Sequence, residues 1–382
     1  MSLVLRDITH ISTELFGYSF QELLSVYEEW RLHMEGMIQA KREALESGAT
    51  NAANVDLISQ LIKEQKIDID GKPYVTKLSD SEVLGNLFAF IVAGHETTAN
   101  SIHFSLIHLA MQPLVQRKVQ QDLEKVFGGR PVSEWEYEQD FPKLFNGILG
   151  AVLSETLRLE SPVLTIPKVV SPSAGPLVID GKSVQLLPNT LIRLAIPAVQ
   201  RNPKYWPHGP PADPNNPVFP LDNLDNDLEE FKPSRWFRVS NGNEKHETSI
   251  EGSLEPGSCN AVPCSDTAPG AFLWTPVKGS YVPFSDGQRS CLGRKFAQVE
   301  IMAALAVIFS QFSVELAVDE WAKDEEVAGM DTEKRKSLWG KAYKKAQGIM
   351  QNNMTCIITV QLKGASIPLR FVEKGHERFF DL

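Results

Sequence analysis

The 382-residue chain is poor in cysteine and has neither a long apolar run nor an excess of basic residues. Its four cysteines are too few for a disulfide framework in a chain of this length, which favours a reducing compartment. Lys and Arg number 38 against 48 Asp and Glu, the formal net charge is −10, and there is no basic arm. Because nucleic acids are bound by clustered cations, this balance argues against nucleic acid as a partner.

The longest apolar runs are short. They lie near residues 87–94 and 301–310, well below the ~18 to 20 residues that span a bilayer. The opening stretch carries Arg6, Asp7 and His10, which is unlike a secretory leader. We therefore expect a chain without a signal peptide or a transmembrane anchor.

Helical periodicity dominates what is present, with helices indicated at 21–45, 55–64, 113–127, 145–159 and 292–311. The longest predicted helix begins with a capping box, Ser79 and Glu82, and continues to Met111. At 1.5 Å per residue it would be about 50 Å long. It is apolar on nearly all sides, so we expect it to be buried.

The β signals are few and fall mostly late in the chain. Asp180-Gly181 separates two β-type runs and predicts a hairpin over 177–184, and strands are expected at 312–316 and 355–362. The segments 208–227 and 241–270, rich in turn-forming residues, are interpreted as surface insertions. With no internal repeat and no linker, we predict one mainly α domain with small β-sheets (α+β) over residues 1–382.

One cysteine lies where a thiolate is favoured. Cys291 belongs to the segment FSDGQRSCLG (284–293), just before a predicted helix whose N-terminal N–H groups favour an anionic sulfur. Arg289 adds a cation, and Gly287 and Gly293 let the backbone approach a flat, bulky group closely. Phe284 would shield the sulfur from water. For an isolated cysteine the alternative is a small buried hydrophobe.

A polar pair interrupts the long apolar helix. The segment AGHETT (93–98) places Glu96 beside Thr97, where polar groups are costly without a partner or a use. Gly94 opens space beside the helix, and Thr97 can hydrogen-bond back to the carbonyl of Ala93, which bends a helix. A simple kink is the alternative.

The cysteine segment resembles the cytochrome P450 motif Phe-x-x-Gly-x-Arg-x-Cys-x-Gly and matches it at every fixed position. The resemblance implies that Cys291 is the axial ligand to the iron of haem b (iron protoporphyrin IX). It also implies that Arg289 pairs with a haem propionate and that Phe284, Gly287 and Gly293 complete the cofactor contacts.

The helix segment is similar to the family's Ala/Gly-Gly-x-Asp/Glu-Thr-Thr motif. By this resemblance the groove at Gly94 accepts O2. Glu96 and Thr97 are the expected catalytic residues, which deliver protons where O2 is reduced.

Further segments resemble the supporting residues of the same family. Glu155 and Arg158 match Glu-x-x-Arg, and FKPSRW (231–236) supplies Arg235 as the third member of a structural triad. Lys168 and Gln200 stand where relatives often carry Arg and His near the haem propionates, and Lys keeps the charge without the bidentate fork. The expected substrate-pocket residues come from two segments and are Phe88, Val92, Ala93, Val163, Leu164 and Ile166.

The resemblance implies a monooxygenase that inserts one atom of O2 into a small apolar organic substrate, in the specialised metabolism of a fungus. Electrons would come from NADPH through a partner reductase at the Cys291 face. The expected location is the cytoplasmic side, with peripheral association with the endoplasmic reticulum.

The family's N-terminal anchor, early β-rich lobe and Trp-x-x-x-Arg helix are not found ahead of Ser79, so we expect an N-terminally truncated P450 fold. The alternative is a haem-binding remnant with little or no catalysis. A haem-thiolate isomerase or peroxide-using enzyme is disfavoured, because such chemistry needs no proton relay.

Overall fold

The computed structural model describes residues 20–47, 56–63, 78–179, 181–210, 226–237 and 273–379. The chain divides into two compact units, Met1–His95 and Glu96–Leu382, and the division falls inside one long helix, α4 (Asp80–Met111). Each unit has its own cluster of buried hydrophobic residues.

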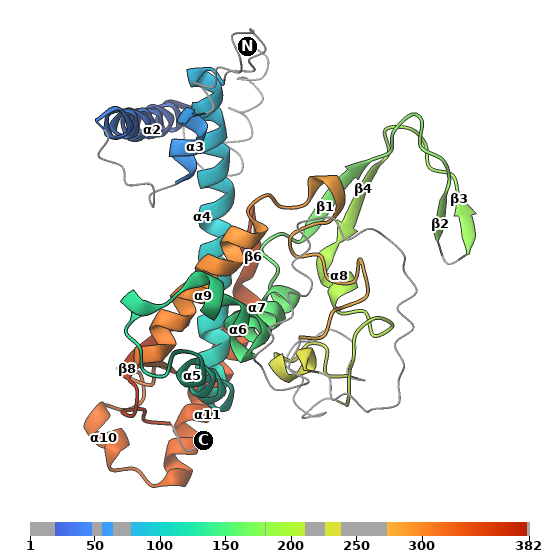
Figure 1. The fold of residues 1–382 in the computed structure, drawn as a ribbon. Helices are drawn as coiled ribbons and strands as arrows, with labels where there is room; N and C mark the ends of the chain where they lie inside the picture. The colour runs from blue at the N-terminus through green and yellow to red at the C-terminus, as the bar shows by residue number, and fades with distance from the viewer. Residues whose placement is uncertain are drawn as a thin grey trace. The chain divides into compact units, whose positions relative to one another are not determined.

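The first unit is a small cluster of helices. The helices predicted at 21–45 and 55–64 are present as α2 (Phe20–Glu46) and α3 (Leu57–Lys63). Both lie against the first half of α4 (Figure 1). Trp30 meets Phe88 edge to face, with ring centroids 4.3 Å apart. The buried residues that the three helices share are Met34, Ile38, Ile62, Val83 and Leu87.

The capping box predicted for the start of α4 is confirmed. The N–H of Ser79 donates to Glu82 Oε2 at 2.8 Å, and the N–H of Glu82 donates to Ser79 Oγ at 3.3 Å. The expectation that the whole helix is buried is wrong for its first half, where Phe88 and Val92 are exposed. That half packs against α2 and α3 on one face, whereas residues 107–111 lie within the core of the second unit.

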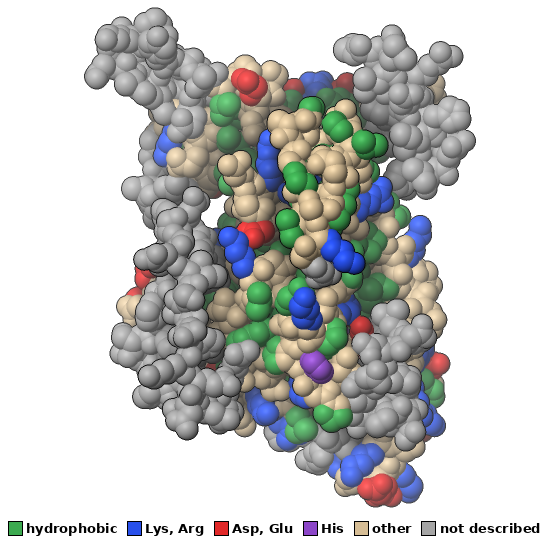
Figure 2. Space-filling model, turned by 90° about the vertical axis from the view of Figure 1, so that its right-hand side faces the viewer, with side chains coloured by type: hydrophobic (Ala, Val, Ile, Leu, Met, Phe, Trp, Pro, Cys, Tyr) green, Lys and Arg blue, Asp and Glu red, His purple; other side chains and the backbone are tan. Residues whose placement is uncertain are grey.

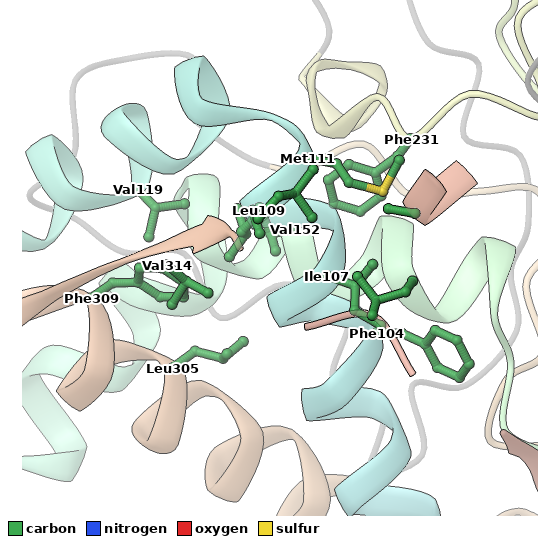
Figure 3. Packing of buried hydrophobic residues seen from close by; sticks show 14 of the residues in the cluster. Phe104, Ile107, Leu109, Met111, Val119, Val152, Phe231, Leu305, Phe309 and Val314 are labelled. Carbon is green, nitrogen blue, oxygen red and sulfur yellow. The ribbon is translucent and has the colours of Figure 1, made fainter. Parts of the chain in front are cut away.

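The second unit is built from helices around the C-terminal half of α4 (Figure 1). In its core Leu109 lies close to Val152, and Met111 lies beside Phe231 (Figure 3). The helices are α5 (Pro113–Phe127), α6 (Tyr137–Asn146), α7 (Ile148–Leu159), α8 (Ile196–Gln200), α9 (Arg294–Gln311), α10 (Asp324–Ala328) and α11 (Thr332–Asn353), with short 3₁₀ turns η1 (Val132–Glu134), η2 (Pro233–Trp236) and η3 (Gly287–Arg289).

The predicted helix boundaries vary in accuracy. α5 ends as predicted, because Gly128 takes a left-handed C-cap with φ 57°. The predicted helix 145–159 is wrong at its start, since α6 ends at Asn146 and Gly147 is extended before α7 begins. α9 begins at Arg294, two residues later than predicted, because the turn that carries Cys291 occupies the preceding residues.

The strands of the described part form small antiparallel pairs, so the α+β prediction is confirmed. The hairpin predicted over 177–184 and the strand at 312–316 are present, whereas the strand expected at 355–362 is a hairpin. The pairs are β1 (Thr165–Val169) with β4 (Leu191–Ala195), β2 (Leu177–Ile179) with β3 (Lys182–Val184), β5 (Phe312–Leu316) with β8 (Leu369–Glu373), and β6 (Met354–Cys356) with β7 (Val360–Leu362).

Apolar side chains also reach the surface of the second unit. Val178, Leu187 and Leu191, in and near the β2–β3 and β1–β4 pairs, are more than half exposed. The face in Figure 2 shows hydrophobic side chains interspersed with Lys and Arg. Among the described helices, none combines the length and apolar character needed to cross a bilayer.

The two expected surface insertions fall largely outside the described residues, which omit 211–225 and 238–272. Asp227, at the end of the first, is buried and paired with Arg235. That residue therefore belongs to the core, not to a surface insertion.

Candidate functional site

The Cys291 segment is a tight turn in front of α9. Ser285 and Gly287 have left-handed backbones, with φ of 60° and 74°. The N–H of Cys291 donates to the carbonyl of Phe284 at 2.8 Å and closes the turn, while Asp286 accepts the N–H of Gly287 at 2.8 Å. A φ of 74° favours glycine at position 287, because a side chain there would be strained.

The turn presents the Cys291 sulfur at the surface, just before α9. Cys291 is exposed, and the neighbouring Leu292 and Phe296 are 84% and 74% exposed. The turn therefore places a soft sulfur donor beside apolar side chains that water solvates poorly, which suits a partner that carries a metal ion on a broad apolar surface.

The acid–alcohol pair lies in the middle of α4. Glu96 and Thr97 are partly exposed, and a Cβ added at Gly94 would meet no atom within 4 Å, so space is open beside this turn. One turn later Ser101 Oγ donates to the Thr97 carbonyl at 2.8 Å. Asn100 Nδ2 donates to Thr359 Oγ1, in the turn between β6 and β7, at 3.0 Å.

Glu155 and Arg158 are wholly buried on α7 and form a bidentate ion pair. Arg158 Nε and Nη2 donate to Glu155 Oε2 and Oε1 at 2.8 and 2.9 Å. Arg235 Nε donates to Glu155 Oε1 at 3.3 Å, and Trp236 Nε1 to Oε2 at 2.9 Å. Burial by itself would raise the pKa of the Glu155 carboxyl, but the charges of Arg158 and Arg235 and these hydrogen bonds hold that pKa below its usual value.

Asp227 is a further member of this cluster that the sequence analysis missed. Its Oδ1 accepts from Arg235 Nη1 at 3.0 Å and its Oδ2 from Lys232 Nζ at 2.6 Å. Burial raises the pKa of the Asp227 carboxyl, and the bonds to Lys232 and Arg235 reverse this and lower it. The cluster joins α7 to η2 and to the segment before it.

Comparisons with known proteins identify the family of the chain. A sequence model of the cytochrome P450 family matches residues 5–215 and 270–338, most of the chain. The chain belongs to the cytochrome P450 family.

Its relatives include many fungal P450 proteins. Over 317 residues it is 27% identical to "Cytochrome P450 monooxygenase 124" of Postia placenta, covering 82% of this chain and 47% of the relative. It is 25% identical over 320 residues to the "Phomenoic acid biosynthesis cluster cytochrome P450 monooxygenase" of Leptosphaeria maculans, covering 82% of this chain and 48% of the relative. The chain therefore spans about half the length of the curated relatives it matches.

A solved cytochrome P450 shares the fold. It superposes with a TM-score of 0.54 at 19% sequence identity, covering 95% of this chain and 59% of that structure. At this identity the likeness concerns the fold alone.

The Cys291 turn of this P450 chain fits a haem. A single soft sulfur donor, the exposed apolar Leu292 and Phe296, and a glycine at 293 match an iron held on a flat apolar macrocycle. A Cβ at Gly293 would lie 3.9 Å from the Cys291 sulfur, so a side chain at 293 would stand in contact with the ligand atom. Arg289 is exposed in the same turn.

The remaining predicted residues of the P450 site are dispersed. Lys168 is exposed on β1, where Ile166 pairs with Leu194 across the β1–β4 ladder. The expected pocket residues divide between the two units: Phe88, Val92 and Ala93 lie on α4, and Val163, Leu164 and Ile166 lie at and before β1.

Gln200 stands where relatives often carry His near the haem propionates. In the structure it is wholly buried at the end of α8 and bonded to protein backbone. Nothing in the sequence around Gln200 or Asp227 indicates that either side chain is buried and hydrogen-bonded inside the protein.

Proposed function

We propose that this cytochrome P450 is a haem-dependent monooxygenase that inserts one atom of O2 into a small apolar organic substrate. The observation that carries the proposal is the exposed Cys291 sulfur, held by a closed turn at the start of α9 between exposed apolar side chains. The presence of Glu96 and Thr97 beside an open position at Gly94 supports oxygen chemistry over simple haem binding.

Haem, when bound, supplies the reduction of O2 and the oxidation of the substrate. Cys291 would hold it through the sulfur and Arg289 through a propionate. The N–H groups at the start of α9 would temper the charge on that sulfur. Because Gly287 and Gly293 have no side chains, the haem could approach the backbone closely at these two positions.

The residues that would deliver protons lie on α4. Thr97 would hold a proton by its hydroxyl on the open side of the helix, and Glu96, partly exposed, would exchange protons with water. Lys168 would add a cation near the cofactor edge. The apolar side chains at Phe88, Val92, Ala93, Val163, Leu164 and Ile166 would orient the substrate and exclude water from it.

The metabolic role, the electron donor and the cellular location are part of the same proposal. Relatives from fungi, one of them named for a biosynthesis cluster, support a role in fungal specialised metabolism. Electrons would come from NADPH through a partner reductase at the Cys291 face. We place the protein on the cytoplasmic side, in peripheral contact with the endoplasmic reticulum.

A carbon monoxide difference spectrum tests the proposal. The full chain is purified with added haem, reduced and exposed to carbon monoxide, beside Cys291→Ala and Cys356→Ala. The two cysteines are both exposed, so Cys356→Ala is a matched control. We expect a thiolate-type, red-shifted Soret band in the wild type and in Cys356→Ala, and its loss in Cys291→Ala.

Absence of haem uptake by the wild type, or an unchanged band in Cys291→Ala, would contradict the proposal and favour a remnant without catalysis. Where the band is present, Thr97→Ala tests the proton role. The variant should keep the thiolate-type band, because Thr97 does not hold the haem. With a partner reductase it should still consume NADPH but yield less oxidised product per NADPH consumed.

A further inference from the structure

The side-chain amide of Gln200 is hydrogen-bonded to protein backbone through both its oxygen and its nitrogen. The side chain is wholly buried. Its Oε1 accepts from the N–H of Val282 at 3.0 Å, and its Nε2 donates to the carbonyls of Leu157 and Arg158, both at 3.0 Å. Both donor hydrogens of the Gln200 amide are thus used on the backbone, so none remains to bind an anionic propionate.

At one end Gln200 completes the C-terminus of α7. The last turn of a helix leaves carbonyls without intrahelical partners, and Nε2 satisfies two of them. The next residue, Arg201, donates from Nη2 to the Leu159 carbonyl at 2.8 Å. Arg158, which binds Glu155, returns a contact by donating from Nη1 to the Gln200 carbonyl at 3.3 Å.

At the other end Gln200 holds the segment that leads into the cysteine turn. The Val282 carbonyl accepts the N–H of Ser285 at 3.0 Å, and the Phe284 carbonyl accepts the N–H of Cys291 at 2.8 Å. A shift of the backbone at Val282 is therefore passed on to the turn that presents the sulfur.

We propose that Gln200 is a positioning residue for the Cys291 thiolate, which it connects to the buried ion pair on α7. Gln200 touches neither the sulfur nor the open side of α4, so its effect passes through the backbone at Val282. An ionised Glu lacks the two donor hydrogens and Leu lacks every polar atom, whereas His keeps one donor and one acceptor. The proposal rests on the proposed function only in taking Cys291 as the haem ligand.

Gln116 is a matched control elsewhere in the same unit. It is also buried, donates from Nε2 to the carbonyls of Leu109 and Val314 at 3.0 and 2.8 Å, and accepts from the N–H of Val314 at 2.8 Å. These bonds join α4 and β5, and none reaches the cysteine turn. Gln116→Leu thus removes the same set of hydrogen bonds at a different place.

The experiment compares amide hydrogen exchange in the full chain, without and with haem, for Gln200→Leu and Gln116→Leu. The decisive amides are Ser285 and Cys291, because neither touches Gln200. We expect them to exchange about tenfold faster in Gln200→Leu, since an unsatisfied network opens more often. In Gln116→Leu they should exchange as in the wild type, although the protein as a whole is less stable.

The haem-loaded protein gives a second readout. Gln200→Leu should lose part of the thiolate-type carbon monoxide band, Gln200→His should retain more of it, and Gln116→Leu should keep all of it. Unchanged exchange at Ser285 and Cys291 in Gln200→Leu, or an equal increase in Gln116→Leu, would overturn the proposal.

If the wild type takes up no haem, the proposed function fails, while the exchange comparison without haem still decides the role of Gln200. Should Gln200→Leu not fold, Gln200→His carries the exchange comparison, with a smaller increase expected at the same two amides.

Discussion

Glu155 is the acid on which α7 and η2 converge. It accepts hydrogen bonds from Arg158, Arg235, Trp236 and the backbone of Lys232, and no part of its side chain is exposed. Arg158 pairs with this carboxylate, and Arg235 is shared between it and Asp227. Removing one partner of a buried ion pair costs more than the pair contributes, because the remaining charge cannot be solvated.

Glu155→Gln should therefore lower the free energy of unfolding by about 3 to 5 kcal/mol. Chemical denaturation measures this against Glu333→Gln, whose carboxylate pairs with Lys336 on the surface of α11 at 3.4 Å. The control should change stability by less than about 0.5 kcal/mol, since exposed ion pairs contribute little. Similar losses in both variants would show that burial of the pair has no effect.

The same carboxylate predicts a pH dependence of stability. Burial opposes ionisation of Glu155, but Arg158 and Arg235 outweigh it and the folded pKa is lowered. An unfolded Glu titrates near about 4.3, so the stabilisation is fully present above that pH and is lost as pH falls through the lower folded pKa. Unfolding free energies measured from neutral to acid pH should fall more steeply for the wild type than for Glu155→Gln. Parallel curves would contradict this.

At the scale of elements, local signals determine where some helices begin and end. α5 begins at Pro113, whose missing N–H costs nothing at a helix start, and ends before the left-handed Gly128. α11 was not predicted from the sequence, because its buried stripe contains small residues, Ala342 and Ala346, and its other faces are polar. Its start follows a local rule all the same, as Asp331 accepts the N–H of Lys334 at 2.8 Å.

Two glycines in these helices should respond to alanine with opposite signs. Gly128→Ala should destabilise the protein by about 1 kcal/mol, since φ of 57° strains a residue with a Cβ. Gly340→Ala in α11 should stabilise it by about 0.5 to 1 kcal/mol, because an added Cβ meets no atom within 4 Å. Thermal or chemical denaturation measures both changes, and the same sign for the two would contradict the argument.

At the scale of the whole molecule, cofactor binding and stability should be linked. A ligand that binds only the folded chain stabilises it by about 2.7 kcal/mol at a hundredfold excess over Kd. Haem covering Leu292 and Phe296 would also remove apolar surface from water. We expect added haem to raise the melting temperature of the wild type and of Cys356→Ala more than that of Cys291→Ala. Equal shifts in all three would point to non-specific haem binding.

The organisation as one domain over residues 1–382 stays a prediction. Contacts divide the chain at His95 and Glu96, within α4, and each part has a hydrophobic core of its own.

What the sequence determined by itself is local. The cysteine turn, the acid–alcohol pair, the capping box and Glu155 with Arg158 lie within about ten residues of their partners, so spacing alone reveals them. Arg235, 80 residues from Glu155, was expected from the family motif, but the other long-range partners emerge only in the folded chain. Val282 meets Gln200 across 82 residues, Trp236 meets Glu155 across 81, and Asn100 meets Thr359 across 259. Such contacts leave no periodic pattern, because burial brings these groups together and obliges each polar atom to find a partner.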